Sequence, residues 1–255
     1  MNFPRILKKR KGYIDRIKPF MQKSVVKVLT GQRRVGKSFL LYQLIEEILA
    51  EEPNANIIYV NLEDFTFSSL QTAEDLHSYI ISHSKEKVKN YIFIDEIQDI
   101  PGFEKVIRSL LLNEDNDIYI TGSNAKMLSG ELATYLSGRY IEFKIYSLSY
   151  SEFLEFHGLT ESETSYELYS RYGGLPYLLN LPLEDETVNE YLKSVYSTIV
   201  FRDVVSRYKL RNTLFLEKLI QFLSENIGNL FSAKNISDYL KSQYQLTKYK
   251  AIRNI

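Results

Sequence analysis

The loop at residues 31–38 constrains this chain more than any other stretch. It reads Gly-Gln-Arg-Arg-Val-Gly-Lys-Ser, so two glycines are separated by four residues and are followed by Lys37 and Ser38. Apolar residues 25–29 precede the loop, and a helical pattern follows it over residues 38–50. This strand–loop–helix order predicts a phosphate-binding loop, in which backbone N–H groups and a helix N-terminus surround a phosphate. A glycine-containing turn that binds nothing is the alternative, and the flanking elements disfavour it.

The loop assigns roles to particular residues. Lys37 is expected to reach the β- and γ-phosphates of a nucleotide, and the Ser38 hydroxyl is expected to hold Mg²⁺. The predicted nucleotide contacts in and beside the loop are Gly31, Arg34, Val35, Gly36, Lys37, Ser38 and Phe39.

A second chemical feature is the run Tyr-Ile-Phe-Ile-Asp-Glu at residues 91–96. Four successive apolar residues are typical of a strand in a parallel sheet that is covered on both faces. Ligands bind at the carboxyl edge of such a sheet, so Asp95 is the predicted Mg²⁺ ligand and Glu96 the predicted base for an attacking water. The two side chains are expected to leave opposite faces if the strand stays regular. A strand that ends in a solvated acidic turn is the alternative.

Two further site candidates follow. A predicted strand over residues 118–121 ends in Gly-Ser-Asn, where Ser123 or Asn124 would sense the γ-phosphate or orient the water, with a simple turn as the alternative. A helix is predicted over residues 128–136. Arg139 precedes a predicted strand at 140–145. It would either reach a γ-phosphate in its own or a neighbouring subunit or form a surface salt bridge, and the sequence favours neither interpretation over the other. The catalytic candidates are Lys37, Glu96, Asn124 and Arg139.

The composition excludes several kinds of site. The chain has 255 residues and no cysteine, which rules out disulfides, zinc–thiolate sites and cysteine nucleophiles. Its formal net charge of zero gives a DNA partner no support, and no apolar run is long enough to predict a membrane span. The histidines are too scattered to predict a metal motif. We therefore expect a cytoplasmic protein. The basic run at residues 8–11 is interpreted as a solvated face, with a nucleic-acid contact as the disfavoured alternative.

With these motifs in view, the chain resembles a large prokaryotic family of AAA+-like phosphate-loop ATPases that pair this core with a C-terminal domain of unknown function. Besides the two motifs above, the resemblance rests on Thr-Gly-Ser-Asn at 121–124, Leu-Ser-Gly-Arg at 136–139, Ser-Leu-Ser-Tyr-Ser-Glu-Phe at 147–153, Gly-Gly-Leu-Pro at 173–176 and Arg-Asp-Val-Val-Ser-Arg-Tyr at 202–208. It implies ATP and Mg²⁺ as ligands, an extra strand between the loop strand and the Asp-Glu strand, and a turn that brings Gly174 and Pro176 near the adenine.

The predicted fold class is α/β: a parallel sheet of the AAA+ phosphate-loop type with helices on both faces, then a helical lid and a partial winged helix. We expect the core at residues 1–149, the lid at 150–228 and the winged-helix region at 229–255. Lid helices are predicted over 150–157, 163–172, 184–206 and 212–226. Family members continue further, so the chain is expected to be C-terminally truncated relative to them. A half-built winged helix would leave apolar residues such as Ile236, Leu240 and Leu246 exposed.

Several functions share these site residues. The favoured one is binding and hydrolysis of Mg-ATP, coupled to a protein partner or a homo-oligomer. The alternative is an ATP-dependent switch with little turnover that signals to a protein or DNA partner. A GTPase is disfavoured because the guanine-reading Asn-Lys-x-Asp element is absent from the sequence. A small-molecule kinase is disfavoured because paired carboxylates suit water activation better.

Overall fold

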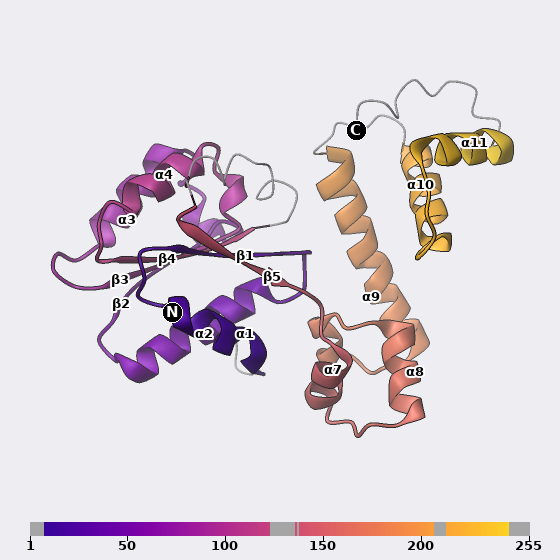
Figure 1. Ribbon diagram of the computed structural model, residues 1–255, viewed down its shortest axis with the longest axis horizontal. Helices are drawn as coiled ribbons and strands as arrows, with labels where there is room; N and C mark the ends of the chain where they lie inside the picture. Colours follow the sequence, from indigo (N-terminus) through magenta and orange to yellow (C-terminus); the bar gives the residue numbers. More distant parts are fainter. Residues whose placement is uncertain (1–7, 123–135, 137, 207–212, 245–255) are drawn as a thin grey trace. The chain divides into compact units, whose positions relative to one another are not determined.

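Parallel strands form the centre of the first of two structural units, Met1–Asn189 and Glu190–Ile255. The computed structural model describes residues 8–122, 136, 138–206 and 213–244. The strands are β1 (Val26–Gly31), β2 (Asn56–Asn61), β3 (Asn90–Asp95), β4 (Asn116–Gly122) and β5 (Tyr140–Ile145). They pair in the order β2-β3-β4-β1-β5 (Figure 1). Strand β4 thus lies between β1 and β3, which confirms the extra strand implied by the resemblance.

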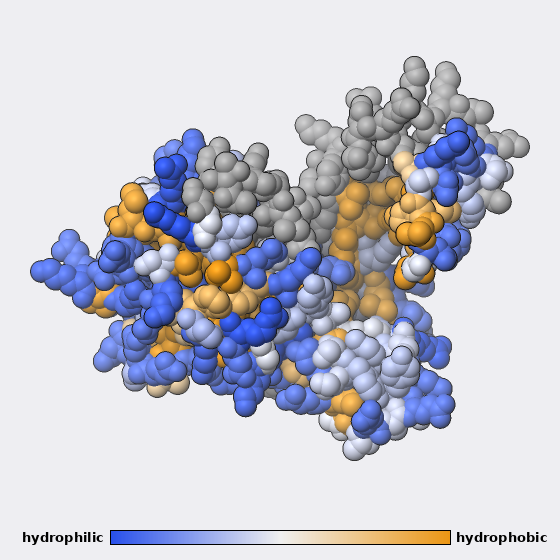
Figure 2. Space-filling model, viewed as in Figure 1, coloured by the Kyte–Doolittle hydropathy of each residue, from blue (hydrophilic) through white to orange (hydrophobic). Residues whose placement is uncertain are grey.

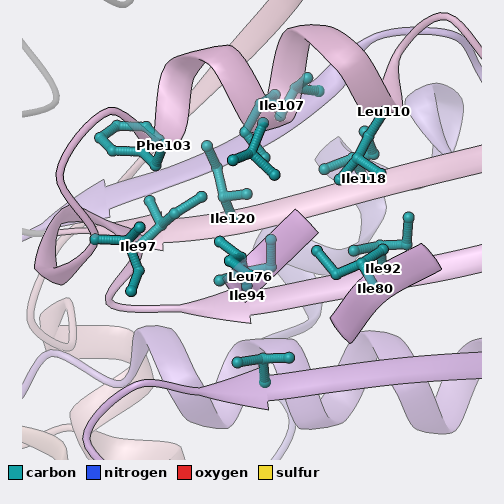
Figure 3. Packing of buried hydrophobic residues seen from close by; sticks show 14 of the residues in the cluster. Leu76, Ile80, Ile92, Ile94, Ile97, Phe103, Ile107, Leu110, Ile118 and Ile120 are labelled. Atoms are coloured by element: carbon teal, nitrogen blue, oxygen red, sulfur yellow. The ribbon is translucent and has the colours of Figure 1, made fainter. Parts of the chain in front are cut away.

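Helices cover both faces of this sheet (Figure 1). One face carries α1 (Lys11–Ile17) and α2 (Lys37–Glu51), and the other carries α3 (Ala73–His83) and α4 (Phe103–Leu110). Figure 3 shows the second face, where aliphatic side chains of β3 and β4 meet Leu76 and Ile80 of α3 and Phe103 and Ile107 of α4. The predicted α/β class with helices on both faces is confirmed.

Burial explains the apolar runs in the sequence. Every residue of β1, β3 and β4 is buried, because these central strands are covered on both faces. The edge strands β2 and β5 have buried and partly exposed residues mixed. Figure 2 shows hydrophilic residues (blue) over much of the surface of this unit in that view, with smaller hydrophobic patches (orange) between them.

A helical region follows β5 and begins with residues 146–180, which we call the α7–α8 segment. It contains α7 (Tyr150–His157), α8 (Glu163–Tyr172) and a 3₁₀ turn at Pro176–Asn180. Ser149 and Glu152 form a capping box that starts α7. Leu148, Phe153 and Phe156 are buried together in a small apolar cluster of their own. The predicted helices at 150–157 and 163–172 are confirmed.

The described residues of the second unit form helices and turns and no strand. Helix α9 (Asp185–Thr198), which begins in the first unit, leads into a π-helix at Ile199–Ser206, and α10 (Thr213–Glu225) and α11 (Ala233–Tyr244) follow. Leu246 lies outside the described residues, and Ile236 and Leu240 are 9% and 0% exposed. The expected exposure of these two residues is therefore wrong: α11 packs on α10 through Phe222, which supplies the cover that we expected to be missing.

The structure differs from the sequence-based expectation at the N-terminus as well. Helix α1 was not predicted, and Arg10 just before it is only 4% exposed, so the interpretation of residues 8–11 as a solvated face is wrong for this arginine. The predicted helix at 128–136 lies, except for Leu136, outside the described residues. Among the helices that the structure does describe, none has the length and apolar character to cross a membrane. The domain boundaries at residues 149 and 228 stay a prediction.

Candidate nucleotide-binding site

The phosphate loop connects β1 to α2 through two glycines that the structure requires. A Cβ atom built on Gly31 would lie 2.3 Å from the carbonyl oxygen of Ile145, so the close approach of β5 excludes any side chain there. Gly36 immediately precedes α2 with φ +94, and Arg34 also has a left-handed φ of 65. These conformations let the chain turn sharply into the helix, whose first N–H groups are then available to an anion.

Lys37 is the first residue of α2, and its side chain is 4% exposed. Its ammonium donates hydrogen bonds to the carbonyl oxygens of Gly31 at 3.3 Å and Gln32 at 3.2 Å. The same ammonium lies 3.4 Å from a carboxylate oxygen of Glu96. The fold therefore brings the lysine of the loop and the second residue of the Asp-Glu pair into contact, although 59 positions separate them in the sequence (96 − 37).

Asp95 is the last residue of β3 and is buried at the carboxyl edge of the sheet. The Thr121 hydroxyl of β4 donates a hydrogen bond to it, and the Ser38 hydroxyl makes a second one. Burial raises the pKa of Asp95, and these hydrogen bonds offset only part of that effect. A carboxylate with a raised pKa gains from a nearby cation, because the cation stabilises its charged form.

Glu96 follows the strand in a left-handed conformation, with φ 56. The expectation of opposite faces assumed a regular strand, and that condition fails because β3 ends at Asp95. The side chain is nearly buried, and the Gln98 amide donates to one of its carboxylate oxygens at 2.5 Å. Lys37 and Gln98 thus contact different oxygens of the same carboxylate.

Two side chains of the site escaped the sequence reasoning. The Thr121 hydroxyl accepts a hydrogen bond from the Glu96 N–H at 3.0 Å as well as donating to Asp95, so it connects β4 with both acidic residues. Tyr59 on β2 donates to the Tyr42 hydroxyl at 3.1 Å, and burial and the charge of Asp95 raise the pKa of Tyr59. The available signal was position: both residues lie near the carboxyl ends of strands next to β3.

The oxygen atoms at this edge suit a magnesium ion. Ser38 supplies a hydroxyl and Asp95 a carboxylate, and the two are within hydrogen-bonding distance of each other. Mg²⁺ takes oxygen ligands and is commonly bound by one or two protein groups, with water and substrate phosphates completing its coordination. The donor set therefore fits the ion that the sequence predicts.

The turn at residues 173–176 lies against the phosphate loop. A Cβ on Gly36 would be 3.8 Å from the Pro176 ring, and a Cβ on Gly174 would be 2.2 Å from the Leu148 carbonyl oxygen. The backbone N–H of Leu148 donates to the carbonyl of Gly174 at 2.7 Å. Phe39 is 47% exposed on the first turn of α2. The structure thus places Pro176 beside the loop, whereas a contact of Gly174 or Pro176 with adenine stays a prediction.

The remaining candidates are not brought to the loop. Arg139 is exposed and precedes β5 at the amino edge of the sheet, where its carbonyl accepts from the Val26 N–H. Because β5 runs parallel to β1, Arg139 is at the opposite edge from the loop, roughly 16 Å along the strand. This placement gives no support to a role in its own subunit, and a role in a neighbouring one stays a prediction. Ser123 and Asn124 lie outside the described residues.

Comparison with protein families finds two matches along the chain. The model of an AAA domain matches residues 23–154, and that of a domain of unknown function (DUF8612) matches residues 163–252. An uncharacterized protein of Haemophilus influenzae is 38% identical over 246 residues, which cover 92% of this chain and 60% of that protein. An uncharacterized protein of Methanocaldococcus jannaschii is 32% identical over 229 residues, covering 85% of this chain and 50% of its own length. The chain thus spans only about half to three fifths of these relatives.

Solved structures with a similar fold include the Orc1 protein of Aeropyrum pernix in complex with DNA. Its TM-score is 0.45 at 15% identity, with 98% of this chain and 81% of that chain covered. Hsp104 of Saccharomyces cerevisiae, in a complex with casein, has a TM-score of 0.49 at 14% identity, with 78% of this chain and 39% of that chain covered.

Proposed function

The chain belongs to the AAA domain family, and from that premise we propose that it binds ATP with Mg²⁺ and hydrolyses it to ADP and phosphate. One observation carries the proposal: the Lys37 ammonium lies 3.4 Å from Glu96, next to Asp95, at the carboxyl edge of the sheet. A cation for phosphate and two carboxylates, one for metal and one for water, are the groups that this reaction uses.

Binding of the triphosphate is assigned to the loop. The N–H groups at the start of α2 and the Lys37 ammonium would donate hydrogen bonds to oxygens of the β- and γ-phosphates. The positive end of the helix dipole also favours negative charge at this place. When bound, Mg²⁺ held by Ser38 and Asp95 neutralises negative charge on the phosphates. The Thr121 hydroxyl keeps the Asp95 carboxylate in place through its hydrogen bond.

Hydrolysis is assigned to Glu96. Its carboxylate accepts a proton from a water molecule while the water oxygen forms a bond to the γ-phosphorus. The bond between that phosphorus and the β–γ bridging oxygen breaks, and its electron pair leaves with ADP. The hydrogen bond from Gln98 holds the Glu96 side chain in position for this transfer. A well-placed base contributes a factor of about 10²–10⁴ in rate.

A second candidate function is an ATP-dependent switch with little turnover. The observation that favours it is the occupation of both Glu96 oxygens, one by Lys37 and the other by Gln98. With one oxygen engaged by Lys37 and the other by Gln98, both oxygens already have side-chain partners in place of an attacking water. Binding would then be retained, and the bound state would act by signalling to a partner.

Partners follow from the same proposal. We infer that the chain acts with a second copy of itself or with another protein, since an exposed Arg139 at the amino edge of the sheet would need a neighbouring subunit to contact a γ-phosphate. A DNA partner gains no support from the net charge of zero. A cytoplasmic location stays a prediction.

Three measurements on the purified chain test these proposals. Calorimetry with ATP, with and without Mg²⁺, measures binding, and phosphate release measures turnover. The molecular mass with and without Mg-ATP shows whether copies assemble. We expect Mg²⁺-dependent ATP binding and slow release of phosphate. Binding without release would select the switch, and no detectable ATP binding would contradict both functions.

A further inference from the structure

We propose that Arg10 is a positioning residue for the nucleotide, which holds the phosphate loop and the α7–α8 segment in the one arrangement that accepts the nucleoside part of ATP. The proposal rests on the proposed ATP binding and adds a residue outside the phosphate loop and the acidic pair. It begins from a buried arginine in a stretch whose sequence predicts a solvated surface.

All the donors of the Arg10 guanidinium are used. One terminal nitrogen donates to the carbonyls of Val35 at 3.2 Å and Tyr146 at 2.8 Å. The other donates to the Ser147 carbonyl at 3.3 Å and to one Glu152 oxygen at 2.8 Å, and Nε donates to the second Glu152 oxygen, also at 2.8 Å. A guanidinium has five N–H groups, and no other type of side chain has enough donors to make this set of contacts.

These contacts join parts of the chain that are far apart in sequence. Val35 belongs to the phosphate loop, Tyr146 and Ser147 follow β5, and Glu152 is in the first turn of α7. The Glu152 carboxylate also accepts from the Ser149 N–H in the capping box, so Arg10 is attached to the start of the helix itself. Arg10 thus contacts the phosphate loop, the first turn of α7 and residues 146–149 between β5 and α7, which we call the linker.

The backbone around Arg10 is itself held on α2. The Arg10 N–H donates to the Gln43 side-chain oxygen at 2.9 Å, and the Gln43 amide donates to the Lys8 carbonyl at 2.9 Å. The guanidinium also lies 4.5 Å from the centre of the Tyr13 ring. Because α2 starts in the phosphate loop, the arginine is fixed to the same helix that presents Lys37.

The linker that Arg10 holds leads on to the turn beside the loop. The Leu148 N–H donates to the Gly174 carbonyl at 2.7 Å, and the Pro176 ring is 3.8 Å from the position of a Cβ on Gly36. Movement of the linker would thus move this turn relative to Gly36. In this proposal the phosphates contact the loop and the nucleoside contacts the turn beside it, so loss of Arg10 should affect these two parts of ATP unequally.

Two ligands separate the effects: ATP, and inorganic triphosphate, which lacks the nucleoside. Both are titrated in the presence of Mg²⁺ into wild type, Arg10→Lys and Glu152→Gln. Lysine keeps the charge but loses most of the contacts, and glutamine keeps the volume and an acceptor for the cap. We expect the Kd for ATP to rise about tenfold or more in both variants, with the Kd for triphosphate changed by less than about twofold. Lys9→Ala is the matched control, because it removes a neighbouring charge from an exposed pair with Glu47.

A double variant and hydrogen exchange test the coupling itself. If the two side chains act through one another, Arg10→Lys combined with Glu152→Gln should weaken ATP binding no more than the stronger single change does. Amide hydrogens of residues 146–149 and 173–176 should exchange faster in Arg10→Lys without any ligand. Triphosphate binding reports that the loop is folded, and Glu152→Gln carries the test if Arg10→Lys does not fold.

The outcomes distinguish this inference from the proposed function. Unchanged ATP affinity in both variants, or an equal loss for ATP and triphosphate, would overturn the role of Arg10 while leaving ATP binding by the wild-type chain intact. A wild-type chain that does not bind ATP would overturn the proposed function and this inference together.

Discussion

The Lys37 ammonium lies 3.4 Å from a carboxylate oxygen of Glu96, and the two side chains are only 4% and 8% exposed. This ion pair links the loop after β1 to the residue after β3, across the strand β4 that separates them. Because both charges are largely removed from water, loss of either one leaves the other poorly compensated. A substitution at one residue should therefore change the behaviour of the other.

Lys37→Ala should abolish measurable ATP binding. Removal of the ammonium leaves the phosphate charge without its cation, and the Glu96 carboxylate loses its ion-pair partner. We expect a loss of affinity of about 10² or more by calorimetry at matched salt and Mg²⁺. Lys11→Ala, which changes an exposed lysine of α1, is the control. ATP affinity within about twofold of wild type in Lys37→Ala would contradict the assignment of this loop.

Glu96→Gln should keep ATP affinity and lose hydrolysis. The ground state of ATP needs no proton acceptor, whereas the attacking water does, and an amide cannot accept that proton. Phosphate release should fall by about 10²–10⁴ while the Kd for ATP changes little. Glu114→Gln removes an exposed carboxylate and serves as the control. The role of Glu96 as base would be wrong if Glu96→Gln released phosphate at the wild-type rate.

Asp95→Asn should make the protein more stable at pH 7 when neither ATP nor Mg²⁺ is present. The folded-state pKa of Asp95 is raised above its ordinary value of 3.8, mainly by burial. A raised pKa means that the folded protein binds the proton of this carboxyl more tightly than the unfolded chain does. Its contribution to stability is complete below pH 3.8 and is lost as the pH rises through the folded-state pKa. At pH 7 this contribution is therefore reduced in the wild type, whereas asparagine has no carboxyl to titrate.

Urea unfolding measures this effect. The midpoint of Asp95→Asn should exceed that of wild type at pH 7, and the difference should shrink as the pH is lowered toward the ordinary Asp value. Addition of Mg-ATP should reverse the order, because only the wild type retains the carboxylate for the metal. A lower midpoint for Asp95→Asn at pH 7 without ligand would show that its hydrogen bonds from Ser38 and Thr121 outweigh its burial.

Gly174→Ala should destabilise the protein and weaken ATP binding. The new Cβ would be 2.2 Å from the Leu148 carbonyl oxygen, so the turn and the linker must separate. Overpacking of this kind costs about 1–3 kcal/mol, measured as a change in the free energy of unfolding. Gly12→Ala is the control: its Cβ would have no neighbour within 4 Å, and alanine favours the helix α1 there. Equal stability of the two variants would mean that the turn can shift freely.

Local patterns predicted the elements of the core well. The central strands are continuous apolar runs, and helix α2 repeats apolar residues at helical spacing, so these elements are recognisable within their own stretches, whereas α1 was not. The loop at residues 31–38 is also recognisable locally, because its spacing of glycines, lysine and serine is a short pattern, although the structure adds a distant reason for Gly31, the approach of β5. The Asp-Glu pair was recognisable for the same reason, since it follows an apolar strand directly.

The residues whose burial or contacts the sequence did not predict have partners that are distant in sequence. Arg10 was assigned to a solvated run because four successive basic residues usually lie on a surface, and its acceptors are residues 25 to 142 positions away. Ile236 and Leu240 were expected to be exposed because nothing near them in sequence indicates that α10 covers them. Tyr59 lies in no motif, and Thr121 was noted only as part of the run at 121–124 with no role of its own, because only strand order brings these two residues next to Asp95.

The sequence by itself thus determined the fold class, the phosphate loop, and the lysine, hydroxyl and carboxylates that lie together beside it, because backbone geometry and apolar spacing are encoded over a few residues. Only the tertiary structure decided which of these groups touch. In the structure, Glu96 has a left-handed conformation and contacts Lys37. Arg139 lies at the amino edge of the sheet, and Arg10 is buried between the loop and α7. Such contacts come from strand order and chain reversal, which bring distant residues together in ways that no local pattern records.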